Sequence, residues 1–434
     1  MFLLGAGMAC AAAVNAQQPA TVSPKPALHR SSHSASAHHA ASHHATAKAK
    51  ASHRKTAHGA VRRSTAAHGA ASRSAKPRSA TRTGSHHVTV RRRRRSYERY
   101  TASSFVKGEV GAGDVTAGED PVVRQAALDA LGEMNGTAVV IDPSNGRILA
   151  MVDQKLALSP GAEPCSTIKL SVALAALSEG LVTNETMVKL DGFRMNMTEA
   201  LAHSNNLYFE ALGRELGFDR VHRYATEFGL GELAGYHIAG EQLGEYPDQP
   251  ISAAQGGVGR MCSFGQGVSV TPLQLGALVA AIANGGTLYY LQHPTTPEEA
   301  SSYQPRIKRK LDIAQYVPEI EDGMAGAVEY GTARSLRMSF RELPVFGKTG
   351  TCSNDGARFG WFASYSESPQ GALATVFFLE GGRPSFGPHA AELTGEFYKN
   401  LWDRGYFAEK NQDARNAPSA GAAAAPAQTL TSVQ

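Results

Sequence analysis

The segment from residue 17 to residue 100 holds almost no large apolar side chains, and this restricts folding to the rest of the chain. Ala, Ser, His, Arg, Lys and Thr dominate the segment. Such a composition cannot bury enough apolar surface to offset the entropy lost on ordering. We therefore predict a disordered tail over 17–104, a folded body over 105–408, and a second disordered tail, rich in Ala and Pro, over 409–434.

Charge divides the chain at the same place. The first hundred residues contain 18 Lys and Arg against one acid, Glu98, whereas the remainder carries a net charge of −12. This asymmetry predicts a basic tail joined to a mildly acidic body. The tail would contact anionic envelope polymers or lipid headgroups by charge alone, or act as a solvated linker. Aromatic residues that could stack on bases are nearly absent from it, so no specific nucleic acid is expected.

The first 16 residues resemble an export signal. An apolar run over 1–14 has the length of a signal-peptide core, and Val14-Asn15-Ala16 is typical of a cleavage site. No basic residue precedes the run, so a truncated membrane anchor and a lipoprotein signal at Cys10 stay open as alternatives. We expect an exported protein, in the periplasm or on the outer face of the cytoplasmic membrane.

The body shows strand patterns at both ends and helical patterns between them. Helices are predicted over 166–179, 198–213, 219–228, 272–284 and 390–402, and strands over 137–142, 147–152, 345–352, 358–366 and 372–380. The 166–179 segment is apolar on most sides, which is typical of a buried helix. This order predicts one α+β unit whose terminal strands meet in one sheet.

Three short motifs stand in order along the body. They are Ser-x-x-Lys at 166–169, Ser-x-Asn at 204–206, and Lys-Thr-Gly at 348–350. Ser166 and Lys169 share one helix face, and burial disfavours the charged form of a lysine. A neutral Lys169 could accept the Ser166 proton and activate the hydroxyl for attack on an acyl group.

Each motif alone is weak evidence, but the set and its order resemble a known family. Residues 135–403 resemble the transpeptidase domain of the penicillin-binding proteins. The resemblance extends to the blocks at 138–151, 163–169, 200–209, 228–231, 265–275, 283–286, 331–333, 347–351 and 360–363. It implies a β-lactamase/transpeptidase-like α+β fold, with an antiparallel sheet packed by helices and a mostly helical subdomain.

The resemblance also implies roles for the acylating residues. Ser166 would be the acylated nucleophile and Lys169 its general base. Ser204 would relay a proton to the leaving amine, and Asn206 would bind both Lys169 and the substrate amide.

The third motif would bind the substrate. Lys348 and Thr349 would hold a terminal carboxylate, and Gly350 would allow a substrate backbone to approach the strand. The backbone N–H groups of Ser166 and Thr351 would form the oxyanion hole. No metal or organic cofactor is implied.

The implied activity is that of a peptidoglycan D,D-transpeptidase, which acylates its serine with D-Ala-D-Ala stem peptides and binds β-lactam antibiotics covalently. A D,D-carboxypeptidase, a serine β-lactamase and a non-catalytic envelope-binding protein are the alternatives. This sequence departs from the family at Cys165, where glycine is usual, and at Ile168, where phenylalanine is usual. The spacing of 38 residues from Ser166 to Ser204 is short and predicts a more open cleft.

The body holds three cysteines, Cys165, Cys262 and Cys352, with no metal-like spacing. The odd number leaves at least one free thiol unless another chain pairs with it. Cys262 and Cys352 both lie near predicted site blocks, so a disulfide between them is an option that only geometry can decide.

Overall fold

The computed structural model describes residues 101–354, 356–383 and 385–408. The predicted signal peptide, residues 17–100 of the basic tail and the tail over 409–434 lie outside these residues. Near the start of the described residues, Ser104 is buried, and its hydroxyl donates to the Arg383 carbonyl at 2.6 Å. None of the helices in the described ranges combines the length and apolarity that crossing a bilayer requires.

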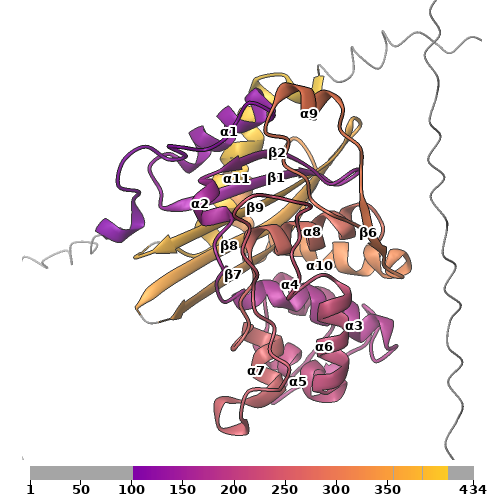
Figure 1. Ribbon diagram of the computed structural model, residues 1–434. Coiled ribbons are helices and arrows are strands. Elements are labelled where there is room, and N and C mark those ends of the chain that lie inside the picture. The colour runs from indigo at the N-terminus through magenta and orange to yellow at the C-terminus, as the bar shows by residue number, and fades with distance from the viewer. Residues whose placement is uncertain (1–100, 355, 384, 409–434) are drawn as a thin grey trace, which may run out of the picture. The chain divides into compact units, whose positions relative to one another are not determined.

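A five-stranded antiparallel sheet forms the centre of the body, in the order β2-β1-β9-β8-β7. Its strands are β1 (Gly136–Asp142), β2 (Arg147–Val152), β7 (Val345–Asn354), β8 (Ala357–Ser368) and β9 (Gly371–Gly381). The first hairpin and the last three strands meet through the pairing of β1 with β9, as the sequence predicts. Strand β7 is an edge of this sheet (Figure 1).

Alternate residues of the central strands enter two separate cores. On β9, Leu373, Phe377 and Leu379 pack with α1 (Pro121–Leu131) and α11 (Gly387–Asp403). Val376 and Phe378 face the opposite core, which includes α8 (Pro272–Ala283). This two-residue period lets one sheet bury both faces under helices.

A mostly helical part lies beside the β7 edge in the lower half of Figure 1. It contains α3 (Lys169–Ser178), α4 (Met197–Ala202), α5 (Asn206–Leu216), α6 (Phe218–Glu227) and α7 (Gly257–Phe264), and α10 (Val317–Glu329) packs against α4 and β7. The shorter elements are α2 (Gln154–Ala157), α9 (Pro297–Ser301), the ribbons β3–β4 (Val188–Lys189, Arg194–Met195) and β5–β6 (Thr287–Tyr289, Ile307–Lys310), and the 3₁₀ turns η1 (Ala102–Ser104), η2 (Cys165–Ile168), η3 (Ala253–Gln255), η4 (Ala314–Tyr316) and η5 (Arg334–Met338).

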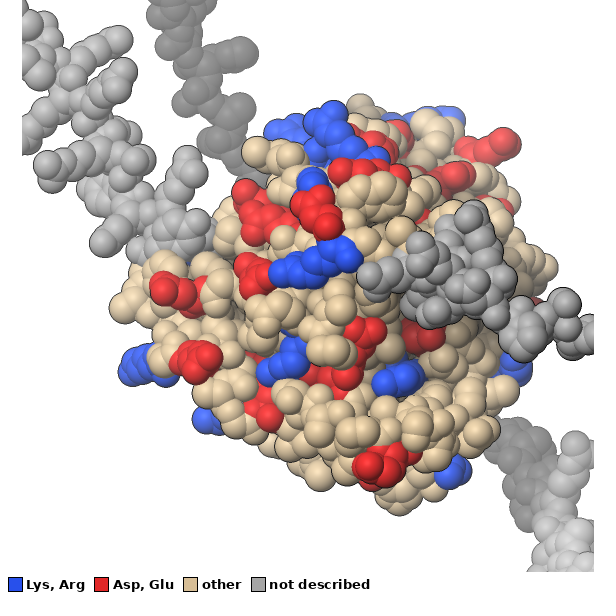
Figure 2. Space-filling model, turned by 90° about the horizontal axis from the view of Figure 1, so that it is seen from above, with Lys and Arg blue, Asp and Glu red and all other residues tan. Residues whose placement is uncertain are grey.

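The predicted α+β class is confirmed, and the differences are local. The predicted helix over 198–213 is two helices, because the helical backbone is interrupted between the end of α4 and the start of α5. The predicted helix over 166–179 begins as the tighter turn η2 before α3 starts at Lys169. Helices α1 and α10 were not predicted. Acidic and basic side chains are interspersed over the face of the body shown in Figure 2.

Candidate active site

The first motif lies on a tight turn at the base of the buried helix α3. Ser166 belongs to η2, and Lys169 is the first residue of α3. The Lys169 side chain is fully buried, and its Nζ lies 2.8 Å from Ser166 Oγ. A three-residue separation across one turn therefore brings the two groups into hydrogen-bond contact.

The second motif lies at the break between α4 and α5. Ser204 has a left-handed backbone, with φ of 54°, which ends α4. The Asn205 side chain then accepts from the Tyr208 N–H at 3.0 Å and caps the start of α5. This local turn points the second motif at Lys169. Its Nζ lies 3.1 Å from both Ser204 Oγ and the Ser204 carbonyl oxygen, and 2.7 Å from Asn206 Oδ1.

The contacts of Lys169 suit a neutral amine. Asn206 Oδ1 and the Ser204 carbonyl can only accept hydrogen bonds, so they take both N–H groups of a neutral amine. The lone pair of the Lys169 amine is then available for a hydroxyl proton, and the Ser166 hydroxyl lies within hydrogen-bond distance of it. Burial lowers the pKa of Lys169 well below its ordinary value, and the positive charge of Lys348 lowers it further, while Glu210 opposes the shift.

The third motif lies on the edge strand β7. Lys348 is fully buried, and its Nζ donates to the Thr349 carbonyl at 3.0 Å. At Gly350 the backbone of β7 lies close to the nucleophile turn. A Cβ there would lie 2.8 Å from the Pro164 carbonyl oxygen, so a larger residue would push the strand away from the turn.

A cavity of about 170 Å³ joins the three motifs. It is lined by Ser166, Ser204, Thr332, Thr349, Thr351 and Pro388. The structure thus brings residues of all three predicted motifs to one cavity, whereas Lys348 is not among the residues that line it. Thr332 and Pro388 were not predicted, although Thr332 falls in the family-like block at 331–333. The Thr349 hydroxyl donates to the Thr332 hydroxyl at 2.7 Å, and the Thr351 hydroxyl accepts from the Gly387 N–H at 2.8 Å.

The buried Lys348 predicts a pH-dependent stability. Burial lowers its pKa to about 7 from an ordinary value of 10.5. Between these values the unfolded chain binds this proton and the folded chain does not, so raising the pH favours folding, by up to ~1.4 kcal/mol per pH unit. We expect Lys348→Met to be stabilised most, relative to wild type, below pH 7, and to lose this advantage as the pH rises. Urea unfolding of both proteins at pH 6, 7.5 and 9 measures the difference in their free energies of unfolding. A difference that does not depend on pH would contradict the prediction.

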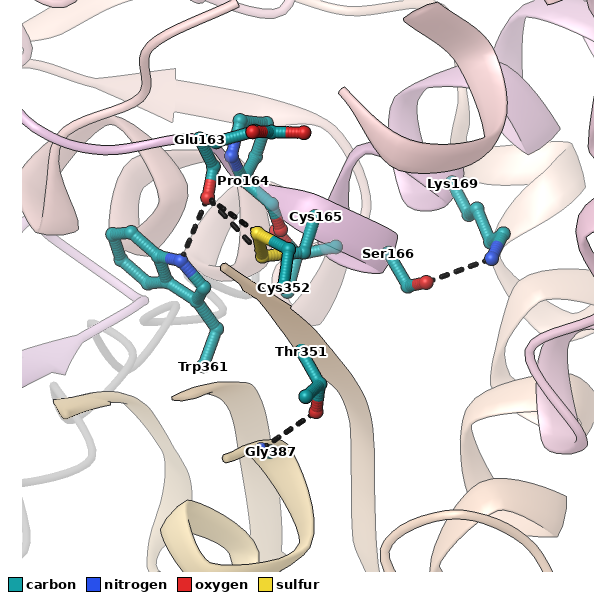
Figure 3. The surroundings of a disulfide bond; sticks show 10 residues. Glu163, Pro164, Cys165, Ser166, Lys169, Thr351, Cys352, Trp361 and Gly387 are labelled. Atoms are coloured by element: carbon teal, nitrogen blue, oxygen red, sulfur yellow. Dashed lines mark hydrogen bonds between the residues drawn. A yellow bond between two sulfur atoms is a disulfide. The ribbon is translucent and has the colours of Figure 1, made fainter. Parts of the chain in front are cut away.

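A disulfide joins the nucleophile turn to β7. Cys165 pairs with Cys352 across a Cα–Cα distance of 5.6 Å (Figure 3). The option of a bond between Cys262 and Cys352 is therefore wrong. Cys262 is a free, buried thiol, and a Cβ on Gly213 would lie 2.6 Å from its sulfur, which shows how closely α5 and α7 pack around it.

The disulfide lies against one backbone carbonyl. The oxygen of Glu163 accepts from Trp361 Nε1 at 3.0 Å and lies 3.3 Å from the Cys165 sulfur and 3.7 Å from the Cys352 sulfur. Figure 3 shows this cluster on the far side of the turn from Lys169. Trp361 comes from β8, so the turn before Ser166 contacts both of the last two strands of the sheet.

Comparisons with known proteins agree with this geometry. Residues 136–399 match the penicillin binding protein transpeptidase domain. The chain is 29% identical over 258 residues to stage V sporulation protein D of Bacillus subtilis, covering 49% of this chain and 39% of that protein. It is 25% identical over 375 residues to the peptidoglycan D,D-transpeptidase MrdA of Acinetobacter baumannii, covering 67% of this chain and 55% of MrdA.

A solved structure supports the same fold. The crystal structure of Pseudomonas aeruginosa PBP2 in complex with WCK 5153 matches with a TM-score of 0.57 at 24% identity, covering 65% of this chain and 74% of that one. The transpeptidase-like fold expected from the sequence is confirmed.

Proposed function

We propose that the chain, which belongs to the penicillin-binding protein transpeptidase family, is a serine acyltransferase. It acts on peptidoglycan stem peptides as a D,D-transpeptidase. One observation carries the proposal. A fully buried lysine amine contacts the hydroxyls of Ser166 and Ser204 and the amide oxygen of Asn206 at 2.7–3.1 Å. This arrangement is suited to moving a proton between two hydroxyls.

Acylation would begin with attack by Ser166 Oγ on the carbonyl carbon of the penultimate D-Ala. The neutral amine of Lys169 takes the hydroxyl proton as the C–O bond forms. The backbone N–H groups of Ser166 and Thr351 hold the oxygen that becomes negative in the tetrahedral intermediate. Support for this assignment is that both residues line the same cavity.

The intermediate would collapse with cleavage of the C–N bond. Ser204 passes the proton from Lys169 to the departing amine of the terminal D-Ala, since its hydroxyl lies 3.1 Å from Lys169 Nζ. Lys348 and Thr349 would bind the terminal carboxylate of the substrate, and the negative charge of that carboxylate would favour the protonated form of Lys348. The acyl group then passes to an acceptor amine, or to water in a carboxypeptidase.

The names of two relatives agree with this choice. These two, MrdA of Acinetobacter baumannii and PbpA of Mycobacterium tuberculosis, are peptidoglycan D,D-transpeptidases, at 25% and 24% identity. The chain spans 39% and 55% of the lengths of stage V sporulation protein D and MrdA. Their full activities are therefore carried over only as part of this proposal.

The proposed substrate places the protein outside the cytoplasm, where peptidoglycan is crosslinked. The Cys165–Cys352 disulfide supports this location, because such bonds form and persist in oxidising compartments. The export signal and the contact of the basic tail with anionic envelope polymers remain predictions.

The proposal is tested by intact-mass spectrometry of the full chain with benzylpenicillin. We expect a stable adduct of one drug molecule, with only slow turnover of nitrocefin. Release of D-Ala from a D-Ala-D-Ala peptide, with and without an added acceptor amine, then separates transfer from hydrolysis. Rapid loss of the drug without an adduct would indicate a β-lactamase. No adduct and no drug loss, from folded protein, would indicate a non-catalytic binding protein.

A further inference from the structure

The disulfide connects the two chain segments that supply the proposed oxyanion hole. Cys165 directly precedes Ser166, and Cys352 directly follows Thr351. Ser166 and Thr351 both line the cavity, so the crosslink lies one residue outside it on each side. In Figure 3 the sulfur atoms lie between the nucleophile turn and the strand that carries Thr351.

In the described part of the chain, few other contacts fix the distance between these two segments. Strand β7 is the edge of the sheet, so the side facing the turn has no partner strand to hold it. At Gly350 the strand approaches the turn without a side chain. The Trp361 indole holds the Glu163 carbonyl, but it does so from β8. The disulfide is thus the covalent link between the turn and β7 itself.

The backbone at Cys165 shows that this link is kept at a cost. Its φ is 52°, in the left-handed region where glycine is favoured and other residues are strained. Cys165 and Ser204 are two of only four non-glycine residues with positive φ in the described part of the chain, and both adjoin the site. A cysteine at this strained position provides the sulfur that reaches Cys352, which glycine cannot.

We infer that the Cys165–Cys352 disulfide is a positioning element of the acylation site, which holds the amides of Ser166 and Thr351 at the spacing that the oxyanion needs. The inference rests on the proposed function of Ser166. It makes acylation sensitive to redox state. A dithiol reductant would break the S–S bond and give two electrons and two protons to the sulfurs, and would itself become a disulfide.

Loss of the disulfide should mainly slow the chemical step of acylation. The oxyanion exists only in the transition state and the intermediate, so loss of the spacing lowers the acylation rate constant more than substrate binding. Misplacement of one donor by a fraction of an ångström is expected to slow acylation about tenfold or more. If the disulfide merely stabilised the fold, its removal would leave the acylation rate constant of the folded protein unchanged.

The experiment measures acylation of the full chain by a fluorescent penicillin in stopped flow, resolving the noncovalent dissociation constant from the acylation rate constant. Oxidised wild type is compared with wild type reduced by dithiothreitol and with the variants Cys165→Ala/Cys352→Ala and Cys165→Gly/Cys352→Ala. Peptide mapping verifies the redox state, and circular dichroism verifies folding. Cys262→Ala is the matched control, because it removes a buried cysteine and leaves the disulfide intact.

We expect the acylation rate constant to fall about tenfold or more in reduced wild type and both double variants, with a dissociation constant changed less than threefold. Cys262→Ala should match oxidised wild type. Rates within twofold of oxidised wild type in the folded, reduced protein, or full recovery in the glycine variant, would overturn the inference and leave the proposed function standing. Absence of labelling in oxidised wild type would overturn both. If a double variant fails to fold, the reduced wild type decides.

Discussion

Ser166→Ala is expected to abolish covalent labelling by penicillins, with a loss of roughly 10⁶-fold that places the reaction below detection, as for removal of the nucleophile in other serine acyl-transfer enzymes. The hydroxyl of Ser166 lies 2.8 Å from Lys169 Nζ and opens onto the cavity. Alanine removes the attacking oxygen and leaves the turn free to keep its shape, because the Thr167 hydroxyl, which donates to the Pro164 carbonyl at 2.7 Å, is unchanged.

The measurement is intact mass after incubation with benzylpenicillin, with peptide mapping of any adduct. Ser171→Ala is a matched control: it removes a buried hydroxyl on α3, the helix that follows the Ser166 turn, and this hydroxyl donates to the Ile168 carbonyl at 2.8 Å. We expect this control to acylate like wild type. An adduct that persists in folded Ser166→Ala would show that another residue is the nucleophile, and mapping would identify it.

The sheet could be predicted from the sequence because its strands carry strong local patterns. The β-branched and apolar runs at 137–142, 147–152 and 372–380 lie within one residue of β1, β2 and β9. The body has strand patterns at both ends and helical patterns between them. This order was enough to predict that the early and the late strands share one sheet. Helices α1 and α10 were missed because both are rich in alanine, glycine or charged residues, and tertiary packing rather than local pattern decides their state.

The geometry of the site needed the fold. A helix-wide pattern over 198–213 hid the break at Ser204, because a left-handed residue leaves no signal in hydrophobic spacing. Cys165 and Cys352 are 187 residues apart, so their pairing follows from the position of β7 beside the turn. The contact of Thr349 with Thr332 likewise joins distant segments. The motifs predicted the candidate site residues, and the fold determines how those residues meet.

Lys169 also explains why the site is buried on one side and open on the other. Its amine is enclosed by Asn206 and the Ser204 carbonyl, whereas Ser166 faces the cavity. Removing the amine from water lowers its pKa, which favours the neutral form that can act as a base. The second buried lysine, Lys348, adds to this shift through its charge. In the proposed mechanism the two lysines have different roles: Lys169 accepts the proton of Ser166, and the protonated form of Lys348 binds the substrate carboxylate.

Lys169→Met and Lys169→Arg are both expected to slow acylation by about 10²–10⁴-fold, the range for loss of a general base. Methionine keeps the apolar stem and removes the amine. Arginine keeps a cation but cannot lose its proton near neutral pH, so it cannot accept the proton of Ser166. The pair therefore separates a need for a base from a need for positive charge. Stopped-flow acylation by a fluorescent penicillin measures both variants, with thermal melting to verify folding.

The pH profile of wild type completes the test. With the neutral amine of Lys169 as the proposed base, the acylation rate should rise with pH through the lowered pKa of Lys169 and reach its plateau well below the ordinary lysine value of 10.5. The residual rate of Lys169→Met should lack this rise. An arginine variant within tenfold of wild type would show that charge, rather than proton transfer, is the contribution of Lys169. A wild-type profile that still rises at pH 10 would place the base elsewhere.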